Sequence, residues 1–298
     1  MKRHPVLTVV AVVAAVLGVV GFLVVRSFLA GGGETSEIPL DEIIRRYEAS
    51  TSVPTSTSAS SLTATSEPTT TTATTAAANI APLSAASSTL VSPPDDTVAA
   101  LPAPGVYVYA TSGGDSIDAV GGVQHDYPAT TTITVTPADC GVLQRWDVVA
   151  ERWEEWRRCA VEGGVAEPGR ATYDEFFDIG QTDRYECTGD ARPLDAAPGT
   201  TWVRTCRQGD EDDVHTGTVV GVEQVDVGGT PVPALHVRTT IDNGVESDRQ
   251  ITESWYQLGS DLLLARSASN RTTNETAFGV VHYVEEYEIR LTALDPLG

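Results

Sequence analysis

Residues 140–159 read CGVLQRWDVVAERWEEWRRC, and this stretch decides between a helical and a β-sheet fold. Its apolar residues recur at helical spacing, and Glu154 and Arg158 would form an i,i+4 ion pair on a helix. The cysteines favour a hairpin instead. Cys140 and Cys159 are 19 residues apart, and the other two cysteines of the chain have the same spacing. Equal spacing indicates that each cysteine pairs with its neighbour in the sequence.

Neighbour pairing is incompatible with a continuous helix. Such a helix would hold Cys140 and Cys159 about 28 Å apart, whereas a disulfide needs Cα atoms within about 7 Å. We therefore predict a hairpin closed by Cys140–Cys159 and a second loop closed by Cys187–Cys206. A helix with crossed disulfides is the alternative. With Cys140 opposite Cys159, the expected cross-strand pairs are Trp146 with Trp153, Leu143 with Trp156, Arg145 with Glu154, and Asp147 with Arg152.

The N-terminus is typical of a membrane anchor. Three basic residues precede an apolar run from Pro5 to Val25, which is long enough to span a bilayer as one helix. We expect a cytoplasmic tail at 1–4, a transmembrane signal anchor at 5–29 and export of all that follows, because basic flanks stay in the cytoplasm. A cleaved signal peptide ending near Ala30 is the alternative.

Two segments separate the anchor from the folded part. In the juxtamembrane segment 30–49, apolar residues at helical spacing from Leu40 to Tyr47 predict a short amphipathic helix, which lies on the membrane, contacts a partner or frays. Residues 50–97 are dominated by Ser, Thr, Ala and Pro without apolar periodicity. We expect them to be a disordered stalk.

Residues 98–298 are predicted to form one exported all-β domain, an antiparallel meander that makes a half-barrel or an open barrel. Five strands are expected in 216–292, where apolar and polar residues alternate, as in Leu235–Ile241. Residues 242–244 (DNG) predict a type I′ turn, 270–276 (NRTTNET) a loop and 172–180 (TYDEFFDIG) a short helix. Helical patterns do not alternate with the strands, which argues against a doubly wound α/β fold.

Charge and cysteine usage restrict the function. The chain carries a formal charge of −22, and residues 101–298 have 14 Arg and no Lys against 33 Asp and Glu, a net charge of −19. Such a domain repels nucleic acids, so we expect no nucleic-acid partner. Four cysteines in an exported segment fit two disulfides. No CxxC or HxxxH spacing is present, so we expect no metal site and no cofactor.

One short motif resembles an enzyme family. Gly114-Asp115-Ser116-Ile117 resembles the nucleophile block of the GDSL-type serine hydrolases, and Asp212 with His215 matches the D-x-x-H of that family's Asp/His block. The resemblance implies a Ser116 nucleophile activated by His215. That family is α/β, however, and its Gly-x-Asn-Asp block is absent from this sequence. We therefore expect no catalytic residues, and a serine hydrolase is a remote alternative for the function.

The last strands resemble a lipid-carrier family. VVGVEQVDVGGTPVPALHVRT (219–239) followed by ESWYQLGSDLLLARS (253–267) is similar to the C-terminal strands of the LolA/LolB-like lipoprotein-carrier half-barrels. That resemblance implies a curved sheet that holds a lipid or acyl chain, and it transfers no particular residue. The order of anchor, stalk and β domain resembles actinobacterial membrane-anchored exported proteins.

These observations lead to a non-enzymatic, membrane-anchored extracytoplasmic protein that binds a lipid or another apolar envelope molecule. The alternative is a module with a filled core that interacts with an envelope protein or the cell wall. The two differ in whether the tryptophans line a cavity. The candidate ligand-lining residues are Trp146, Trp153, Trp156, Trp202 and Trp255.

Overall fold

The computed structural model describes residues 35–52, 101–276 and 279–298. The predicted anchor at 5–29 and most of the predicted stalk at 50–97 lie outside these residues. Among the described residues, no helix combines the length and the apolar character needed to cross a bilayer.

The described elements are one helix, one 3-10 turn and fourteen strands. They are α2 (Leu40–Thr51), β1 (Gly105–Ile117), η1 (Ala119–Gly121), β2 (Val123–Asp126), β3 (Thr130–Ala138), β4 (Gly141–Val149), β5 (Arg152–Val161), β6 (Gly164–Phe176), β7 (Ile179–Gly189), β8 (Arg192–Pro193), β9 (Thr201–Gln208), β10 (Glu211–Val227), β11 (Thr230–Asp242), β12 (Arg249–Gln257), β13 (Leu263–Thr276) and β14 (Gly279–Leu291).

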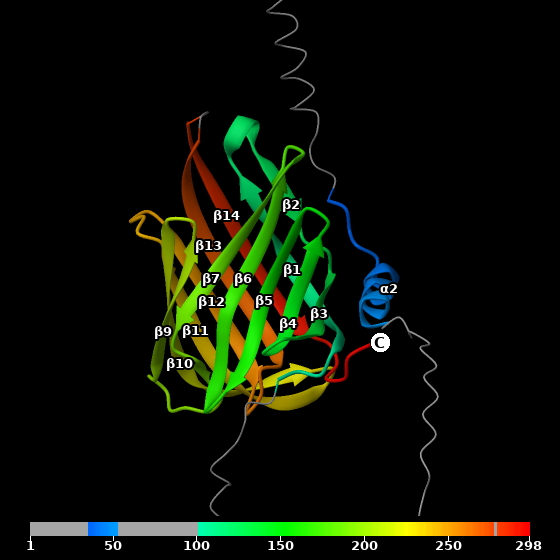
Figure 1. Ribbon diagram of the computed structural model, residues 1–298. Helices are drawn as coiled ribbons and strands as arrows, with labels where there is room; N and C mark the ends of the chain where they lie inside the picture. Colours follow the sequence, from blue (N-terminus) through cyan, green and yellow to red (C-terminus); the bar gives the residue numbers. More distant parts are fainter. Residues whose placement is uncertain (1–34, 53–100, 277–278) are drawn as a thin grey trace, which may run out of the picture.

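Twelve of these strands close into one antiparallel barrel, which Figure 1 shows from the side. The order around the wall follows the sequence, except that β2 pairs with the end of β1 and β8 pairs with β6. β14 pairs with β1 from Tyr109–Leu291 to Ile117–Tyr283, and this pairing closes the barrel. The prediction of an all-β meander is confirmed, but the predicted half-barrel or open barrel is wrong. Closure leaves no long unpaired edge in the wall.

The disulfides are Cys140–Cys159 and Cys187–Cys206, as predicted. The 140–159 segment is a hairpin of β4 and β5, but its predicted register is wrong by one residue. Cys140 lies in the turn between β3 and β4 rather than in a strand, and Gly141 is the residue opposite Cys159. The observed pairs are Gln144 with Trp156, Arg145 with Glu155, Trp146 with Glu154, and Asp147 with Trp153.

Three local predictions are also wrong. Residues 172–180 are not a helix but the end of β6, a two-residue turn and the start of β7, and Phe177 and Asp178 of the turn take positive φ angles of 57° and 58°. The 242–244 turn is not type I′, since the connection runs from Asn243 to Asp248 and only Gly244 in it has a positive φ. Residues 270–276 are not a loop, because β13 continues through them in register with β14. Barrel strands can contain many polar residues. Such strands cannot be distinguished from loops by hydrophobic periodicity or by turn-residue composition.

The lower part of the barrel interior is a conventional apolar core. Its largest fully buried side chains include Trp146, Tyr109, Leu235 and Ile289. The β10–β11 hairpin runs along this lower end in Figure 1, and its tip meets the C-terminal segment, where Gly228 lies against the Thr292 carbonyl. Burial of these side chains, each contributing about 1.5–3 kcal/mol, supplies most of the driving force for folding.

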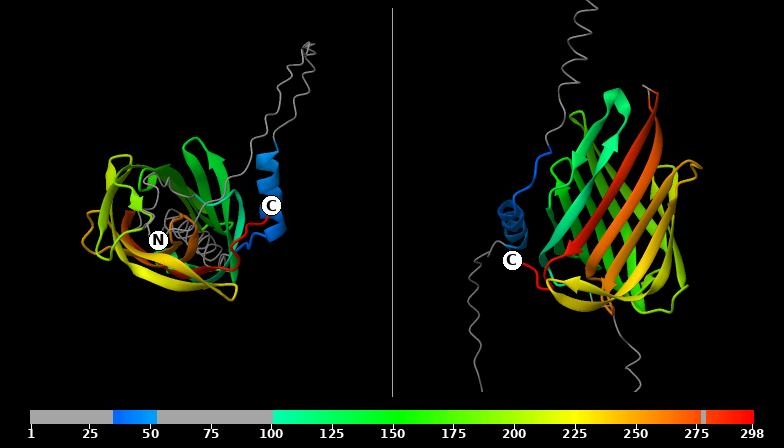
Figure 2. Two further views of the ribbon diagram at one scale, coloured as in Figure 1. Left: turned by 90° about the horizontal axis from the view of Figure 1, so that it is seen from below. Right: turned by 180° about the vertical axis from the view of Figure 1, so that it is seen from behind.

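The amphipathic helix of the juxtamembrane segment packs on the outside of the barrel. α2 lies against β1 and β3 with Ile43 buried, and Figure 2 shows it alongside the wall in both views. The residues before it are held by the β4–β5 turn, because Ala150 N–H donates to the Ser36 carbonyl and Ser36 N–H donates to the Glu151 carboxylate. Part of this segment therefore belongs to the barrel domain.

Candidate functional site

A cavity of about 80 Å³ lies inside the barrel, above the apolar core. Five of the 14 arginines of residues 101–298 line it. Only two carboxylates, Glu154 and Glu167, share the lining with them. The volume is below the roughly 300–1,000 Å³ of sites for drug-sized ligands, so it suits a small ion or headgroup. The arginines are Arg158, Arg170, Arg192, Arg204 and Arg266.

Strand alternation places these arginines inside. On β9, Trp202, Arg204 and Cys206 occupy alternate positions and therefore share the inner face. Arg204 lies opposite His215 of β10, and Trp202 lies opposite Gly217, where any side chain would collide with the indole ring. The sequence thus forces Arg204 into the barrel together with two buried apolar neighbours.

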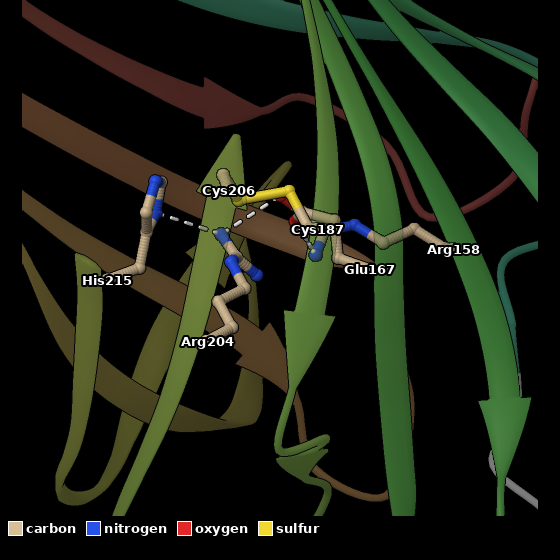
Figure 3. Close-up of a disulfide and its surroundings, with 6 residues drawn as sticks. All are labelled: Arg158, Glu167, Cys187, Arg204, Cys206 and His215. Atoms are coloured by element: carbon tan, nitrogen blue, oxygen red, sulfur yellow. Dashed lines mark hydrogen bonds and ion pairs between the residues drawn. A yellow bond between two sulfur atoms is a disulfide. The ribbon is translucent and has the colours of Figure 1, made fainter. Parts of the chain in front are cut away.

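One carboxylate neutralises two of the arginines next to the inner disulfide (Figure 3). Glu167 pairs with Arg158, and its other oxygen lies 2.9 Å from Arg204. These arginines hold the pKa of Glu167 below its usual value although burial alone would raise it. Ligand atoms of Glu167, Cys187 and Cys206 lie within 4.8 Å of one another. Both sulfurs are bonded in the disulfide and the surroundings are cationic, so this group is not a metal site in this state.

A second buried carboxylate, that of Asp261, forms ion pairs with arginines of the cavity. Asp261 pairs with Arg192, lies 3.9 Å from Arg158 Nε and accepts a 2.9 Å hydrogen bond from Gln144. Its side chain is fully buried. Three of the five cavity arginines therefore have a carboxylate partner.

Arg170 and Arg266 have no carboxylate within 4.0 Å among the residues that the structure describes. Arg266 donates from Nε to Ser254 at 3.3 Å and lies over the Trp156 ring at 4.5 Å. Arg170 lies over the Tyr185 ring at 5.1 Å. Aromatic faces attract cations, but more weakly than a desolvated carboxylate does.

The cavity also holds buried N–H donors that no acceptor in the described part of the chain satisfies. They are Nε of Arg158, Arg170, Arg192 and Arg204, and Nε2 of His215. Because Arg204 donates to Nδ1 of His215 at 3.3 Å, the neutral imidazole carries its proton on Nε2. An unsatisfied buried donor costs about 1–3 kcal/mol. Both oxygens of Glu167 also lack a well-aligned hydrogen bond, but they form ion pairs with Arg158 and Arg204. The five donors are therefore positions at which an added acceptor would form hydrogen bonds.

Two pKa shifts in the cavity reflect its arginines. Burial, followed by Arg170 and Arg204, lowers the pKa of His215 to about 2, so this side chain is neutral at physiological pH. The pKa of buried Tyr256 is lowered because Arg158, Arg266 and Arg192 outweigh the effect of its burial. Nearby cations favour both shifts. The pKa of Arg266 is raised despite its burial, because Tyr287, Tyr256 and Glu154 offset part of the positive charge.

A second charged group, the acidic cluster, lies nearer the upper end of the barrel, where the β4–β5 and β6–β7 turns are. It is built around Arg152, which pairs with Glu154, with Asp174 at 3.0 Å and with Glu285 at 3.2 Å. Tyr127 and Asn270 donate to Glu285 at 2.7 and 2.9 Å. The cluster also includes the pair Asp115–His125, which is 2.8 Å apart.

In this cluster carboxylates outnumber cations, the reverse of the cavity. Burial, with the charges of Glu285 and Asp115, raises the pKa of Asp174 to about 6 despite Arg152. The pKa of Glu285 is raised as well, first by burial and then by Glu154. The pKa of His125 is raised because Asp115 outweighs the effect of burial.

The five candidate tryptophans do not form one lining. Trp156 and Trp202 border the cavity, and Trp146 is in the apolar core, where its Nε1 donates to Thr131 at 2.9 Å. Trp153 and Trp255 are on the outer face, where Trp153 stacks on Tyr173 and Trp255 stacks on His236. The predicted ligand-lining role is thus geometrically open to Trp156 and Trp202.

The residues of the hydrolase motif are spread over distant strands. Ser116 of β1 lies opposite Gln124 and Val284, whereas His215 of β10 bonds Arg204 inside the barrel. Asp212 faces outward and pairs with Arg207 at 2.7 Å. The structure does not bring Ser116, Asp212 and His215 together as a triad.

A larger hollow of about 640 Å³ lies by η1, between the ends of β1, β2 and β14. It is open, and its His282 and Asp118 are exposed and paired with each other at 2.7 Å. We place the candidate site in the smaller cavity, because its charged groups are buried and its donors lack acceptors.

The sequence search missed the inner arginines. A signal for them was present, because Trp202, Arg204 and Cys206 are in phase on one strand, as are Arg266 and the buried Ala268. An arginine in phase with buried residues must either pair or bind an anion. Glu285 is also buried, with 1% of its surface exposed, although its neighbour Glu286 is exposed.

Comparison with known proteins adds little. No family model matches the chain and no curated protein matches it. One solved structure that aligns is a Bacteroides fragilis protein described as an "exported protein with YmcC-like fold", with 9% identity, a TM-score of 0.28, 66% of this chain covered and 100% of that chain covered. A TM-score this low carries no inference, and the expected LolA/LolB resemblance is not confirmed.

Proposed function

We propose that this protein is an extracytoplasmic, non-enzymatic binding protein that holds an oxyanion in the arginine-lined cavity. The oxyanion is either a free ion or the headgroup of a larger molecule. The observation that carries the proposal is the set of five buried N–H donors without hydrogen-bond partners, all around one cavity. Carboxylate, phosphate and sulfate oxygens are the acceptors that arginine binds best.

The cavity supports a charged ligand better than the apolar molecule expected from the sequence. Its volume of about 80 Å³ is small for an acyl chain, and its walls carry five guanidinium groups. A lipid would therefore bind through its phosphate rather than through its tails. The apolar core beneath the cavity is filled. If no anion binds, the alternative is the module that interacts with an envelope protein or the cell wall.

The location is supported by the two disulfides, which persist in oxidising compartments. Anchoring by residues 5–29 is part of the proposal and rests on the sequence alone. The strongly acidic composition of the barrel domain also bears on selectivity, because it disfavours polyanions at the outer surface while the cavity accepts one small anion.

Isothermal titration calorimetry of the full chain with sodium sulfate and sodium phosphate, at fixed ionic strength in chloride, tests the proposal. We expect one site per chain. Arg266→Gln should weaken binding about tenfold or more, because a hydrogen bond to a charged group contributes about 1.5–3 kcal/mol. The matched control is Arg157→Gln, which removes an exposed arginine from the same barrel and should leave the affinity unchanged.

A second arm identifies the source of the anion. Sedimentation with phosphatidic acid vesicles, compared with phosphatidylcholine vesicles, distinguishes a lipid headgroup from a free ion. Binding to the vesicles that sulfate does not compete away would place the lipid elsewhere on the protein. The absence of binding to either ion and to the vesicles would refute the proposal.

A further inference from the structure

The arginine-lined cavity and the acidic cluster share one residue. Glu154 lines the cavity, and its carboxylate pairs with Arg152 of the cluster. On β5, Trp156 of the cavity is the next inward residue after Glu154, and Asn270, which lines the cavity, donates to Glu285 of the cluster at 2.9 Å. An anion in the cavity therefore lies near the buried carboxylates of Glu154 and Glu285, and Asp174, whose side chain is 32% exposed, lies on the other side of Arg152. Electrostatic repulsion among the buried groups is only weakly screened.

The surroundings of Asp174 are acidic on nearly every side. Arg152 and His125 are the cations within the cluster, and Arg170 and Arg266 of the cavity also act on Glu154. The neutral donors Tyr127, Tyr283 and Asn270 complete the contacts of the cluster. The carboxylates facing it are Asp115 of β1, Glu151 of the β4–β5 turn, Glu154 of β5, Asp183 of β7 and Glu285 of β14.

We infer that oxyanion binding in the cavity is coupled to proton uptake by the acidic cluster, so that the ligand binds more tightly as the pH falls. This inference rests on the proposed function. When Asp174 and Glu285 are ionised, they repel an anion in the neighbouring cavity. Their protonation removes that repulsion, and by linkage a bound anion favours their protonation to the same extent.

The expected increase in affinity as the pH falls agrees with the direction of the pKa shifts in the cluster. Because the pKa of Asp174 is raised to about 6 and that of Glu285 is raised, the cluster gains protons between pH 7 and 5. Protonation of His125, whose pKa is also raised, adds positive charge over part of this range and acts in the same direction. His215 stays neutral throughout, because its pKa is about 2.

Sulfate is the right probe, because its charge is constant over this range whereas that of phosphate is not. Calorimetric titration of the full chain with sulfate at pH 8, 7, 6 and 5 should show an affinity increase of about fivefold or more. Repeating the titration at pH 6 in two buffers of different ionisation enthalpy should show net proton uptake with sulfate.

Matched variants locate the effect. Asp174→Asn and Glu285→Gln should each raise the affinity at pH 8 and flatten its pH dependence. Glu286→Gln removes the exposed carboxylate next to Glu285 and should leave the profile unchanged. Thermal unfolding of each variant checks that it is folded.

The outcomes separate the inference from the proposed function. Sulfate binding with a flat pH profile, or a sloped profile that persists in both Asp174→Asn and Glu285→Gln, overturns the inference and leaves the binding function standing. Failure of sulfate to bind at every pH overturns both.

Discussion

The cavity and the acidic cluster occupy the same barrel wall, on neighbouring inward positions, yet their charge imbalances are opposite. In the cavity, arginine donors lack acceptors. In the cluster, Arg152 is shared among three carboxylates. Buried charges rarely stabilise a fold more than apolar residues of the same size would. The apolar core below contains neither the cavity arginines nor the charged residues of the acidic cluster. The difference supports the proposal that this interior binds a ligand.

The strongest test of the comparison is a Glu→Gln substitution in each region, one in the cavity and one in the acidic cluster. Glu167→Gln leaves Arg158 and Arg204 without their carboxylate and should lower the free energy of unfolding by about 3–5 kcal/mol. Glu285→Gln relieves an excess of acid and should change it by less than about 1 kcal/mol. Urea unfolding at pH 7.5 measures both. Equal losses would mean that the two regions do not differ as described.

The two disulfides close loops of equal sequence separation, 19 residues. Removal of either pair by Cys→Ser substitution should therefore lower the free energy of unfolding by a similar amount, about 3 kcal/mol. Only the pair Cys187/Cys206, which lies beside Glu167, should also weaken sulfate binding. Thermal unfolding and calorimetry give the two readouts. Loss of binding on removal of Cys140/Cys159 would show that the effect is not local to the cavity.

The pH dependence of stability should report the cluster. The folded-state pKa of Asp174, about 6, is above its unfolded value near 3.8. The stability linked to it is fully present below pH 4 and is lost as the pH rises through 6. The free energy of unfolding of the natural chain, relative to that of Asp174→Asn, should fall between pH 4 and pH 7. A constant difference would show that Asp174 titrates normally.

The smallest effect that we expect is a change in tryptophan fluorescence. Sulfate should change the fluorescence of Trp156 and Trp202, which border the cavity, and not that of Trp153 and Trp255 on the outer face. Trp→Phe substitution at each position assigns the signal. A change that disappears in Trp153→Phe would place the anion outside the barrel.

The sequence predicted the meander and both disulfides, because strand alternation and cysteine spacing are local signals. It did not predict closure, because the pairing of β1 with β14 joins residues far apart in the chain. The register of the 140–159 hairpin failed because Cys140 was treated as a strand residue, although it lies in a turn. The charged interior was missed because arginines and glutamates are ordinarily assigned to the surface, and only their phase with residues such as Trp202 shows otherwise.

The central claim is that the inner arginine donors bind an oxyanion. Nitrogen–proton correlation spectra of the arginine Nε–H groups test it most directly, with signals assigned by Arg→Gln substitution in the full chain. Addition of sulfate should shift the Nε–H signals of Arg170, Arg192 and Arg204, which have no acceptor in the described structure, and leave that of Arg157 in place. Unchanged inner signals, or shifts confined to Arg157 and other exposed arginines, would contradict the account.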